Sequence, residues 1–398
     1  NLVYVTTTGT NNNYLHIVGV IGEGEIDSIV QSGGVDQIWL DDKLYTSYPG
    51  LVYYEFYSGS MTQNVCAALQ SATAGTSEAW NDPLRGTAYI YLRLTYDRDK
   101  FLHIPDITVE VKGLKVLDTR SSTTAWSDNP ALCAYDYLTR SSRRGGMGIS
   151  TSRIITSSVD SAATYCESKG WDLNIVLSNN DSAIDQIQKL LAVYRGNLIY
   201  SQCQFKFVYR DLNDESAVMA LTENDVEEQK GISTLRIDQP TVFDTPNCMR
   251  IKFPNEANKY IMDDYVLTDS TAVDADGDLR EKSIDLDGVT NYTNAMILAA
   301  YHLERARVNK TIQLEAHSRC LALEPHDLIT VTHTFPGWSE KLFRVSAVGL
   351  NPEGGAVIQA VEEATAFYND TYDMASHSYY DTTIPNPTAT VPNVINVS

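Results

Sequence analysis

The feature that most constrains this chain is a series of short runs, rich in β-branched and aromatic residues, that fills its first 120 positions. The clearest run is Ala88 to Tyr96, and similar runs lie at Tyr4 to Thr8, Tyr14 to Val20, Ile38 to Leu40, Leu51 to Tyr57 and Ile107 to Leu117. Such side chains suit a pleated, half-buried surface. The N-terminal part is therefore predicted to be a β domain, with one short helix over 64–71.

Residues 121–204 differ, because helical spacing replaces the strand-like runs. Three helices are predicted, over 128–140, 158–169 and 182–194. The first begins with Asp128 or Asn129 as its N-cap and Pro130 in its first turn, and the second is closed by Gly170. The apolar positions of the third recur at helical intervals, at Ile184, Ile187, Leu190, Leu191 and Tyr194. A β-hairpin over 197–209 follows.

Strand-like runs return after residue 204, at 205–209, 233–237, 249–253, 311–316, 328–333, 343–350 and 357–361. Between them, residues 256–310 contain an acidic loop and one long helix over about 292–308. Residues 371–398 show no periodicity, contain prolines and are predicted to be a linker. The sequence therefore predicts an α+β protein dominated by β-structure, with two β-rich blocks that resemble an internal duplication.

The charge of the chain limits what it can bind. Its 398 residues contain 51 acidic and 30 basic residues, which gives a net charge of −21. A general nucleic-acid binder needs the opposite sign to displace counterions from phosphates, and an anionic membrane surface would repel this chain for the same reason. The length predicts about two to four domains.

Cysteine usage and the chain ends carry less information. The six cysteines are scattered without a CxxC pair, so we interpret them as reduced core thiols rather than a zinc ribbon or a disulfide scaffold. No stretch approaches the about 20 apolar residues of a membrane-spanning helix, and no signal peptide is recognised. Since the chain opens at Asn1, we expect both ends to be trimmed from a longer protein.

A search for chemical motifs predicts no catalytic, cofactor or metal site. Phosphate-binding, dinucleotide-binding and metalloprotease signatures are missing from the sequence. The acidic run Asp274, Asp276 and Asp278 lacks the first and twelfth ligands of an EF-hand, so a solvated turn is the default and a weak cation site of another kind stays open. Four potential metal ligands fall within 17 residues, but strand geometry separates their faces; they are His317, Cys320, His326 and His333.

One basic cluster stands out in this acidic chain. Arg140, Arg143 and Arg144 lie at the end of the first predicted helix, before a glycine-rich stretch that we interpret as a flexible helix exit. They form either a docking patch for an acidic partner or a set of C-terminal charges that complement the helix dipole. Both interpretations stay open at this point.

Several segments resemble one known family in order and spacing. Residues 129–139 and 143–149 resemble the NPA…YD-x-LT and R-x-G-x-G segments of phage tail-tip proteins, the tip attachment and central hub proteins of lambdoid siphophages. Further matching segments are 22–27, 35–42, 181–192, 195–200 and 205–208. The chain departs from the family at the hairpin turn, where Gln202 to Gln204 replace the usual glycine, and it lacks the long receptor-binding C-terminal part.

The resemblance implies a specific architecture. It implies two tail-tube-like antiparallel β-barrel or sandwich domains and two smaller α-containing accessory domains. Their expected bounds are 1–120 for the first tube-like domain, 121–204 for an accessory domain, 205–255 with 311–370 for the second tube-like domain, 256–310 for an accessory insertion and 371–398 for the linker.

The resemblance also implies a function. Three copies would form a ring that joins the hexameric tail tube to the tip and host-recognition apparatus and surrounds part of the DNA ejection channel. The implied partners are a homotrimer, tail-tube and distal-tail proteins, tip or fibre proteins, and genomic DNA that passes without specific binding. The protein would be assembled in the bacterial cytoplasm, reside at the tail tip of the virion and need no cofactor or catalytic residue.

Two alternatives from other classes stay open. A virion-associated or secreted carbohydrate-active enzyme would use tryptophans as sugar platforms and a pair of carboxylates, one with a raised pKa. A β-rich adhesin module would be monomeric. The hub hypothesis instead predicts a threefold assembly whose acidic excess faces the bore, because carboxylates repel phosphates.

Overall fold

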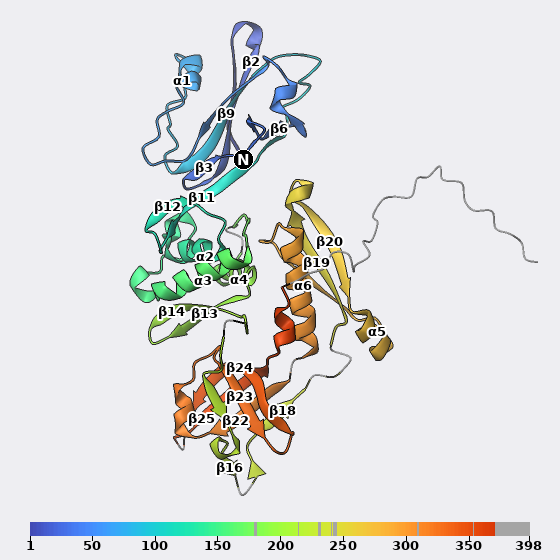
Figure 1. The fold of residues 1–398 in the computed structure, drawn as a ribbon. Helices are drawn as coiled ribbons and strands as arrows, with labels where there is room; N and C mark the ends of the chain where they lie inside the picture. Colours follow the sequence, from blue (N-terminus) through green and yellow to red (C-terminus); the bar gives the residue numbers. More distant parts are fainter. Residues whose placement is uncertain are drawn as a thin grey trace, which may run out of the picture. The chain divides into compact units, whose positions relative to one another are not determined.

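The structure is a computed structural model that describes residues 1–178, 181–213, 215–229, 232–239, 241, 245–308, 310–352 and 354–370; the predicted linker 371–398 lies outside the described residues. The protein is α+β and β-dominated, with 38% strand and 25% helix (Figure 1). The chain divides into two compact units. Unit 1 comprises 1–173, 177–194 and 202–207, and unit 2 comprises 174–176, 195–201 and the residues from 208 onward.

Unit 1 begins with a four-stranded antiparallel sheet in the order β1-β2-β9-β8. Its strands are β1 (Leu2–Thr8), β2 (Tyr14–Glu23), β8 (Val52–Tyr57) and β9 (Thr87–Thr95). Three small sheets accompany it, in the orders β10-β6-β7, β12-β11-β3 and β4-β5. Their strands are β3 (Ile26–Ile29), β4 (Gln31–Ser32), β5 (Val35–Asp36), β6 (Ile38–Leu40), β7 (Lys43–Leu44), β10 (Ile107–Val109), β11 (Val111–Asp118) and β12 (Thr123–Trp126).

The predicted N-terminal strands are confirmed, and their alternation explains the packing. One face of the four-stranded sheet buries Ile17, Ile90 and Leu92 in a cluster with residues of β6. The opposite face buries Tyr89 and Tyr91 under helix α1 (Ala67–Thr73) and its loop. Both faces are apolar because successive side chains of a strand point in opposite directions. No closed barrel forms among the described residues.

The predicted helices of the middle segment are confirmed as α2 (Pro130–Thr139), α3 (Thr156–Lys169) and α4 (Ala183–Ala192). Of the two predicted N-caps of α2, the Asn129 side chain accepts the hydrogen bonds, and Gly170 ends α3 in the left-handed conformation, as the sequence predicts. Ile184, the first apolar position of α4, is 64% exposed. Gln186 takes the buried position in that first turn and donates to the carbonyl oxygen of Asp181.

The predicted hairpin is formed by β13 (Gly196–Ser201) and β14 (Gln204–Tyr209). The residues of its turn, Gln202 and Cys203, have φ angles of 50° and 65°. Two consecutive left-handed residues make the twist that two-residue hairpins favour. Glycine or asparagine would adopt this backbone with less strain, so the departure from the family pattern has a local energetic cost.

Unit 2 contains a six-stranded sheet in the order β15-β23-β24-β25-β22-β18. Its strands are β15 (Met219–Leu221), β18 (Arg236–Asp238), β22 (Thr311–Ala316), β23 (Leu328–His333), β24 (Trp338–Leu350) and β25 (Ala356–Glu362). A separate two-stranded sheet joins β16 (Glu228–Gln229) to β17 (Ile232–Ser233). The four central strands are antiparallel, and both edge strands are only three residues long.

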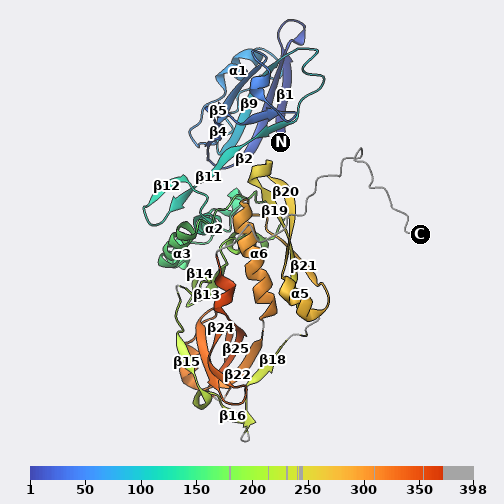
Figure 2. The ribbon, with the colours of Figure 1, turned by 45° about the vertical axis from the view of Figure 1, so that its right-hand side comes forward.

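A second layer of unit 2 differs from the sequence prediction. The predicted second β domain includes residues 249–253, whereas β19 (Cys248–Asn255) pairs with β20 (Ile261–Thr268) and β21 (Glu281–Asp285). Figures 1 and 2 show this three-stranded sheet beside α6 (Tyr292–Arg307). The accessory part therefore begins with β19, before the predicted boundary at residue 256. The sequence could not show this, because alternation identifies a strand but not its partner.

Short helical segments complete the described chain. The expected acidic loop is in fact helix α5 (Ser270–Asp276), which ends at the left-handed Gly277. The 3₁₀ turns are η1 (Thr10–Asn12), η2 (Tyr45–Ser47), η3 (Ser142–Arg144), η4 (Thr151–Arg153), η5 (Glu223–Asp225), η7 (Glu256–Asn258), η8 (Ser318–Ala322) and η9 (Thr365–Tyr368). Of the helices in the described ranges, none has the length and apolar character needed to cross a membrane.

Candidate interaction surfaces

The structure separates the three arginines of the basic cluster into two roles. Arg140 is the C-cap residue of α2, and its guanidinium forms an ion pair with Asp136 one turn earlier. Burial raises the pKa of the Asp136 carboxyl, and the neighbouring guanidinium opposes that rise. Arg143 and Arg144 lie on η3, where both are exposed and neither has an ion-pair partner among the described residues.

The glycine-rich exit from α2 is a hydrogen-bonded turn rather than an open tether. Gly148 N–H donates to the Arg140 carbonyl at 2.8 Å, and Ile149 N–H donates to the Leu138 carbonyl at 2.9 Å. A Cβ on Gly146 would lie 2.3 Å from the Arg140 carbonyl oxygen, so only glycine fits there. The turn therefore presents Arg143 and Arg144 on a defined backbone.

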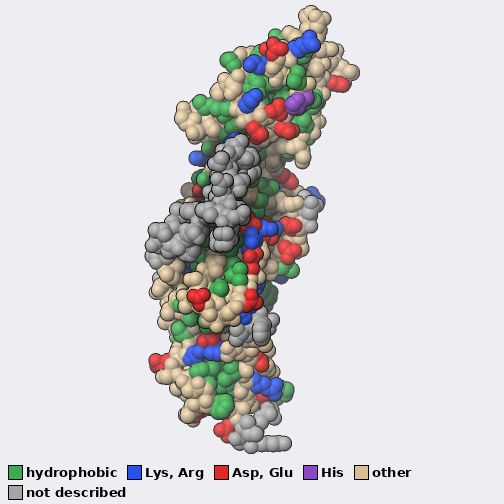
Figure 3. Space-filling model, turned by 90° about the vertical axis from the view of Figure 1, so that its right-hand side faces the viewer, with side chains coloured by type: hydrophobic (Ala, Val, Ile, Leu, Met, Phe, Trp, Pro, Cys, Tyr) green, Lys and Arg blue, Asp and Glu red, His purple; other side chains and the backbone are tan. Residues whose placement is uncertain are grey.

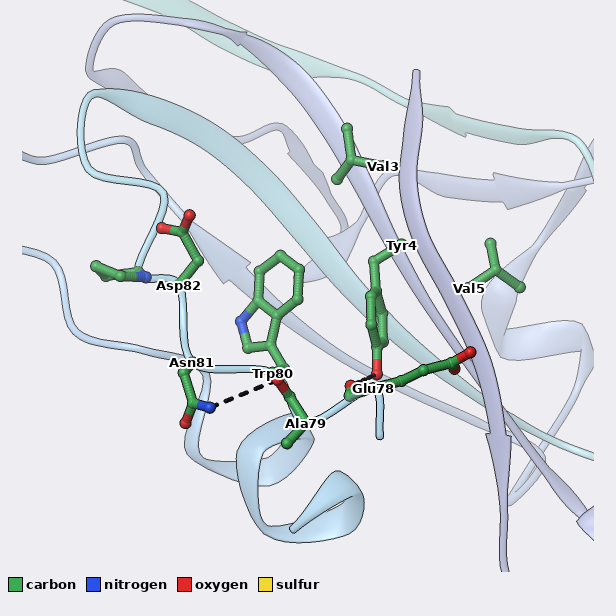
Figure 4. Close-up of a pocket in the computed structure, with 9 residues that line it drawn as sticks. Val3, Tyr4, Val5, Glu78, Ala79, Trp80, Asn81 and Asp82 are labelled. Carbon is green, nitrogen blue, oxygen red and sulfur yellow. Dashed lines mark hydrogen bonds between the residues drawn. The ribbon is translucent and has the colours of Figure 1, made fainter. Parts of the chain in front are cut away.

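An open groove lies beside the edge strand β1 in unit 1 (Figure 4). It has a cavity volume of about 780 Å³ and is lined by Val3, Tyr4, Val5 and residues 78–83. The Trp80 ring packs edge-on against the Tyr4 ring, with centroids 5.0 Å apart, and is almost fully buried. The indole therefore belongs to the core and offers no open platform on which a sugar could stack.

The carboxylates of the groove are engaged by the chain itself. Glu78 accepts a hydrogen bond from the Thr6 hydroxyl at 2.7 Å, and Asp82 accepts one from the Leu84 N–H at 2.8 Å. These contacts hold both carboxylates in place as acceptors. The groove thus combines apolar β-strand side chains with an acidic rim.

Sequence reasoning missed a buried ion-pair network in unit 2. Arg344 on β24 contacts Glu363 at 2.6 Å and Glu215 at 2.7 Å. Tyr368 donates a hydrogen bond to Glu363 at 2.9 Å, and the His326 carbonyl accepts one from Arg344 at 3.0 Å. Burial raises the pKa of the Glu215 carboxyl, and the guanidinium opposes that rise. A lone arginine between two apolar strand residues gives no sequence signal of such a network.

Within the acidic run 274–278, Asp276 forms ion pairs with two arginines. Asp276 contacts the guanidinium of Arg280 and, at 2.9 Å, that of Arg307, and accepts a hydrogen bond from Asn247 at 3.1 Å. The Arg307 hydrogen bond lowers the pKa of Asp276 to about 2. This carboxylate therefore ties α5 to α6, and the candidate cation site at Asp274, Asp276 and Asp278 gains no support.

The histidine and cysteine set is also dispersed. Cys320 is buried in η8, whereas His317 precedes that turn and His333 ends β23. Within the described ranges, no group of three or more His, Cys, Asp or Glu side chains is arranged to hold a metal ion.

On the face of the molecule drawn in Figure 3, acidic and basic side chains are interspersed.

Comparisons with known proteins show which proteins this chain is similar to. A family model described as "Putative phage tail protein" matches residues 182–348. The chain is 23% identical to baseplate hub protein pb3 of Escherichia phage T5 over 348 residues, which cover 79% of this chain. That match covers 36% of the pb3 protein, so the chain spans about a third of this relative's length.

A solved structure is also similar in fold. A chain of the virion of a native gene transfer agent particle matches with a TM-score of 0.63 and 16% identity. The match covers 92% of this chain and 82% of that chain. At this identity the likeness concerns the fold.

Proposed function

We propose that the chain is a member of the phage tail-tip and baseplate hub proteins, acting as a structural hub at the tip of a phage or phage-derived tail. The observation that carries the proposal is the similarity to a baseplate hub protein over 79% of the chain. The two β-rich units support it, because a hub must offer sheet surfaces to several neighbours. Its place is the virion, after assembly in the bacterial cytoplasm.

We propose that three copies form a ring that joins the tail tube to the tip apparatus. The edge strand β1 supports ring formation, since it is seven residues long and exposes Leu2, Val3 and Val5. Exposed apolar edge strands promote aggregation unless another chain covers them. A head-to-tail contact that closes into a ring would cover the same edge in every copy.

The proposed ring surrounds part of the DNA ejection channel. The net charge of −21 supports this role, since carboxylates on a bore repel the phosphates of passing DNA and prevent counterion-release binding. The acidic excess is expected on the bore. A structure of the trimer with a neutral or basic bore would overturn that part of the proposal.

The proposed role involves no catalysis. Supporting observations are the carboxylates of the groove, which accept hydrogen bonds from the chain itself, and the buried carboxylates of unit 2, which are held by Arg344. A glycosidase instead needs one protonated and one ionised carboxyl group that face a cleft. Tail-tube, distal-tail and tip or fibre proteins are the proposed partners.

The mass of the purified protein tests the proposal. Native mass spectrometry and light scattering at two concentrations should give a species near three times 44.2 kDa. A monomer at both concentrations would contradict the ring and favour the adhesin module. Hydrolysis of bacterial-surface polysaccharide, lost on substitution of one carboxylate, would instead favour the enzyme.

A further inference from the structure

A basic patch in unit 1 brings together arginines that are far apart in the sequence. The guanidinium of Arg144 lies 3.3 Å from the sulfur of Met61. The same sulfur lies 3.3 Å from the Cβ position of Gly86, next to Arg85, whose Nε donates to the Gln63 carbonyl at 3.4 Å. Arg143 precedes Arg144 on the same 3₁₀ turn. We call the set Arg85, Arg143, Arg144 and Met61 the basic patch.

The patch has the character of an unfilled docking surface. Its three arginines are exposed, and none forms an ion pair with a carboxylate among the described residues, although the chain has 51 acidic residues. Met61, whose sulfur contacts the Arg144 guanidinium, is 55% exposed. Guanidinium groups and an adaptable thioether are side chains that protein interfaces favour.

Charge complementarity identifies the occupant. A second copy of this chain carries a net charge of −21, and its residues 211–228 contain seven carboxylates and neither lysine nor arginine. Within the described part of that stretch, Glu215 and Asp225 are paired with Arg344 and Arg319 of their own chain, whereas Glu223 and Glu228 are exposed. Glu223 accepts a hydrogen bond from the Thr334 N–H at 2.5 Å, next to Phe335, whose side chain is 89% exposed.

The two surfaces match in chemistry. Carboxylates can receive the planar guanidinium groups in paired hydrogen bonds, and the exposed phenyl ring suits contact with both arginine and methionine. Nucleic acid fits less well, because three arginines form few phosphate contacts against the repulsion of the whole chain. We propose that the basic patch of one copy docks on the Glu223–Phe335 surface of a second copy.

This inference rests on the proposed ring, because it names a contact between neighbouring copies. The contact is heterologous, since two different surfaces meet, and such contacts generate rings when the rotation closes. It assigns Arg143 and Arg144 to partner binding and leaves Arg140 with its structural ion pair to Asp136.

Charge reversal tests the contact on the full chain. The variant R85E/R143E/R144E is compared with R98E/K100E/R153E, which makes the same charge change at exposed residues elsewhere in unit 1. Native mass spectrometry over a concentration series gives the dissociation constant for self-association. We expect about 100-fold weaker association for the patch variant, because like charges then face each other, and less than a threefold change for the control.

A compensating variant makes the test specific. Adding E223K to the patch variant reverses the charge on the Glu223–Phe335 surface as well and should restore association to within tenfold of the wild type. Circular dichroism spectra confirm that each variant is folded.

Four results would overturn the inference. They are unchanged association of the patch variant, no restoration by the compensating variant, and a wild type that stays monomeric. The fourth is that the wild type binds a labelled 30-base-pair DNA duplex and the patch variant does not. The first two leave the proposed ring intact, whereas a monomeric wild type contradicts the ring itself. The DNA result would assign the patch to nucleic acid.

Discussion

Replacing Arg344 by methionine should strongly destabilise unit 2. Arg344 is 3% exposed at its side chain, and its partner Glu363 is 1% exposed. Methionine has a similar length and keeps the aliphatic packing, but it provides no donor. The change would leave the Glu363 carboxylate buried without its guanidinium partner, while the Tyr368 hydroxyl still donates to it.

The magnitude follows from the burial of the pair. Removing one partner of a buried ion pair costs about 3–5 kcal/mol, because the other charge remains without compensation. Glu215, the second carboxylate on Arg344, has a side chain that is 23% exposed and can regain water. The retained Tyr368 contact places the expected loss near the lower limit, about 3 kcal/mol. For a unit of this size, that loss lowers Tm by about 6–12 °C.

Differential scanning calorimetry provides the assay, since the two units need not unfold in one transition. The matched control is Arg250→Met, because Arg250 also forms a 2.6 Å ion pair, with Glu281, but both of these side chains are more than a third exposed, and its loss should shift Tm much less. The double variant R344M/E363Q should recover part of the loss, since the buried carboxylate at position 363 is removed together with its cation. A Tm for Arg344→Met within 2 °C of the wild type would refute the reasoning.

The remaining predictions concern local strain and pH. Cys203→Gly should stabilise the β13–β14 hairpin by up to about 1 kcal/mol in urea unfolding, because glycine adopts the left-handed backbone without strain; a loss of stability would contradict this. Gly146→Ala should displace the η3 turn and lower Tm, whereas Gly113→Ala, where nothing lies near the Cβ and φ is also not positive, should cost much less; equal effects would disprove the steric argument. Burial lowers the pKa of His302 to about 4, so the unfolded chain binds more protons below pH 6.5. Stability should therefore fall as the pH drops from about 6.5 to 4, and His302→Gln should flatten that part of the Tm–pH curve.

Much of the local structure is readable from sequence alone. The helices that begin at Asn129 and end at Gly170, and the strands 38–40, 311–316 and 328–333, lie where capping and alternation place them. These signals are local, because a cap or a period depends on residues a few positions apart. The resemblance to tail-tip proteins likewise depended on the order of short segments, and the comparisons support it.

Pairings between distant segments were decided only by the tertiary structure. Period two identifies residues 249–253 as a strand, but it cannot choose between the six-stranded sheet and the layer with β20 and β21. The basic cluster shows the same limit. Sequence proximity groups Arg140 with Arg143 and Arg144, whereas folding pairs Arg140 with Asp136 and brings Arg85 and Met61 to the other two. Sequence determines what a segment prefers, and long-range packing determines which segment it meets.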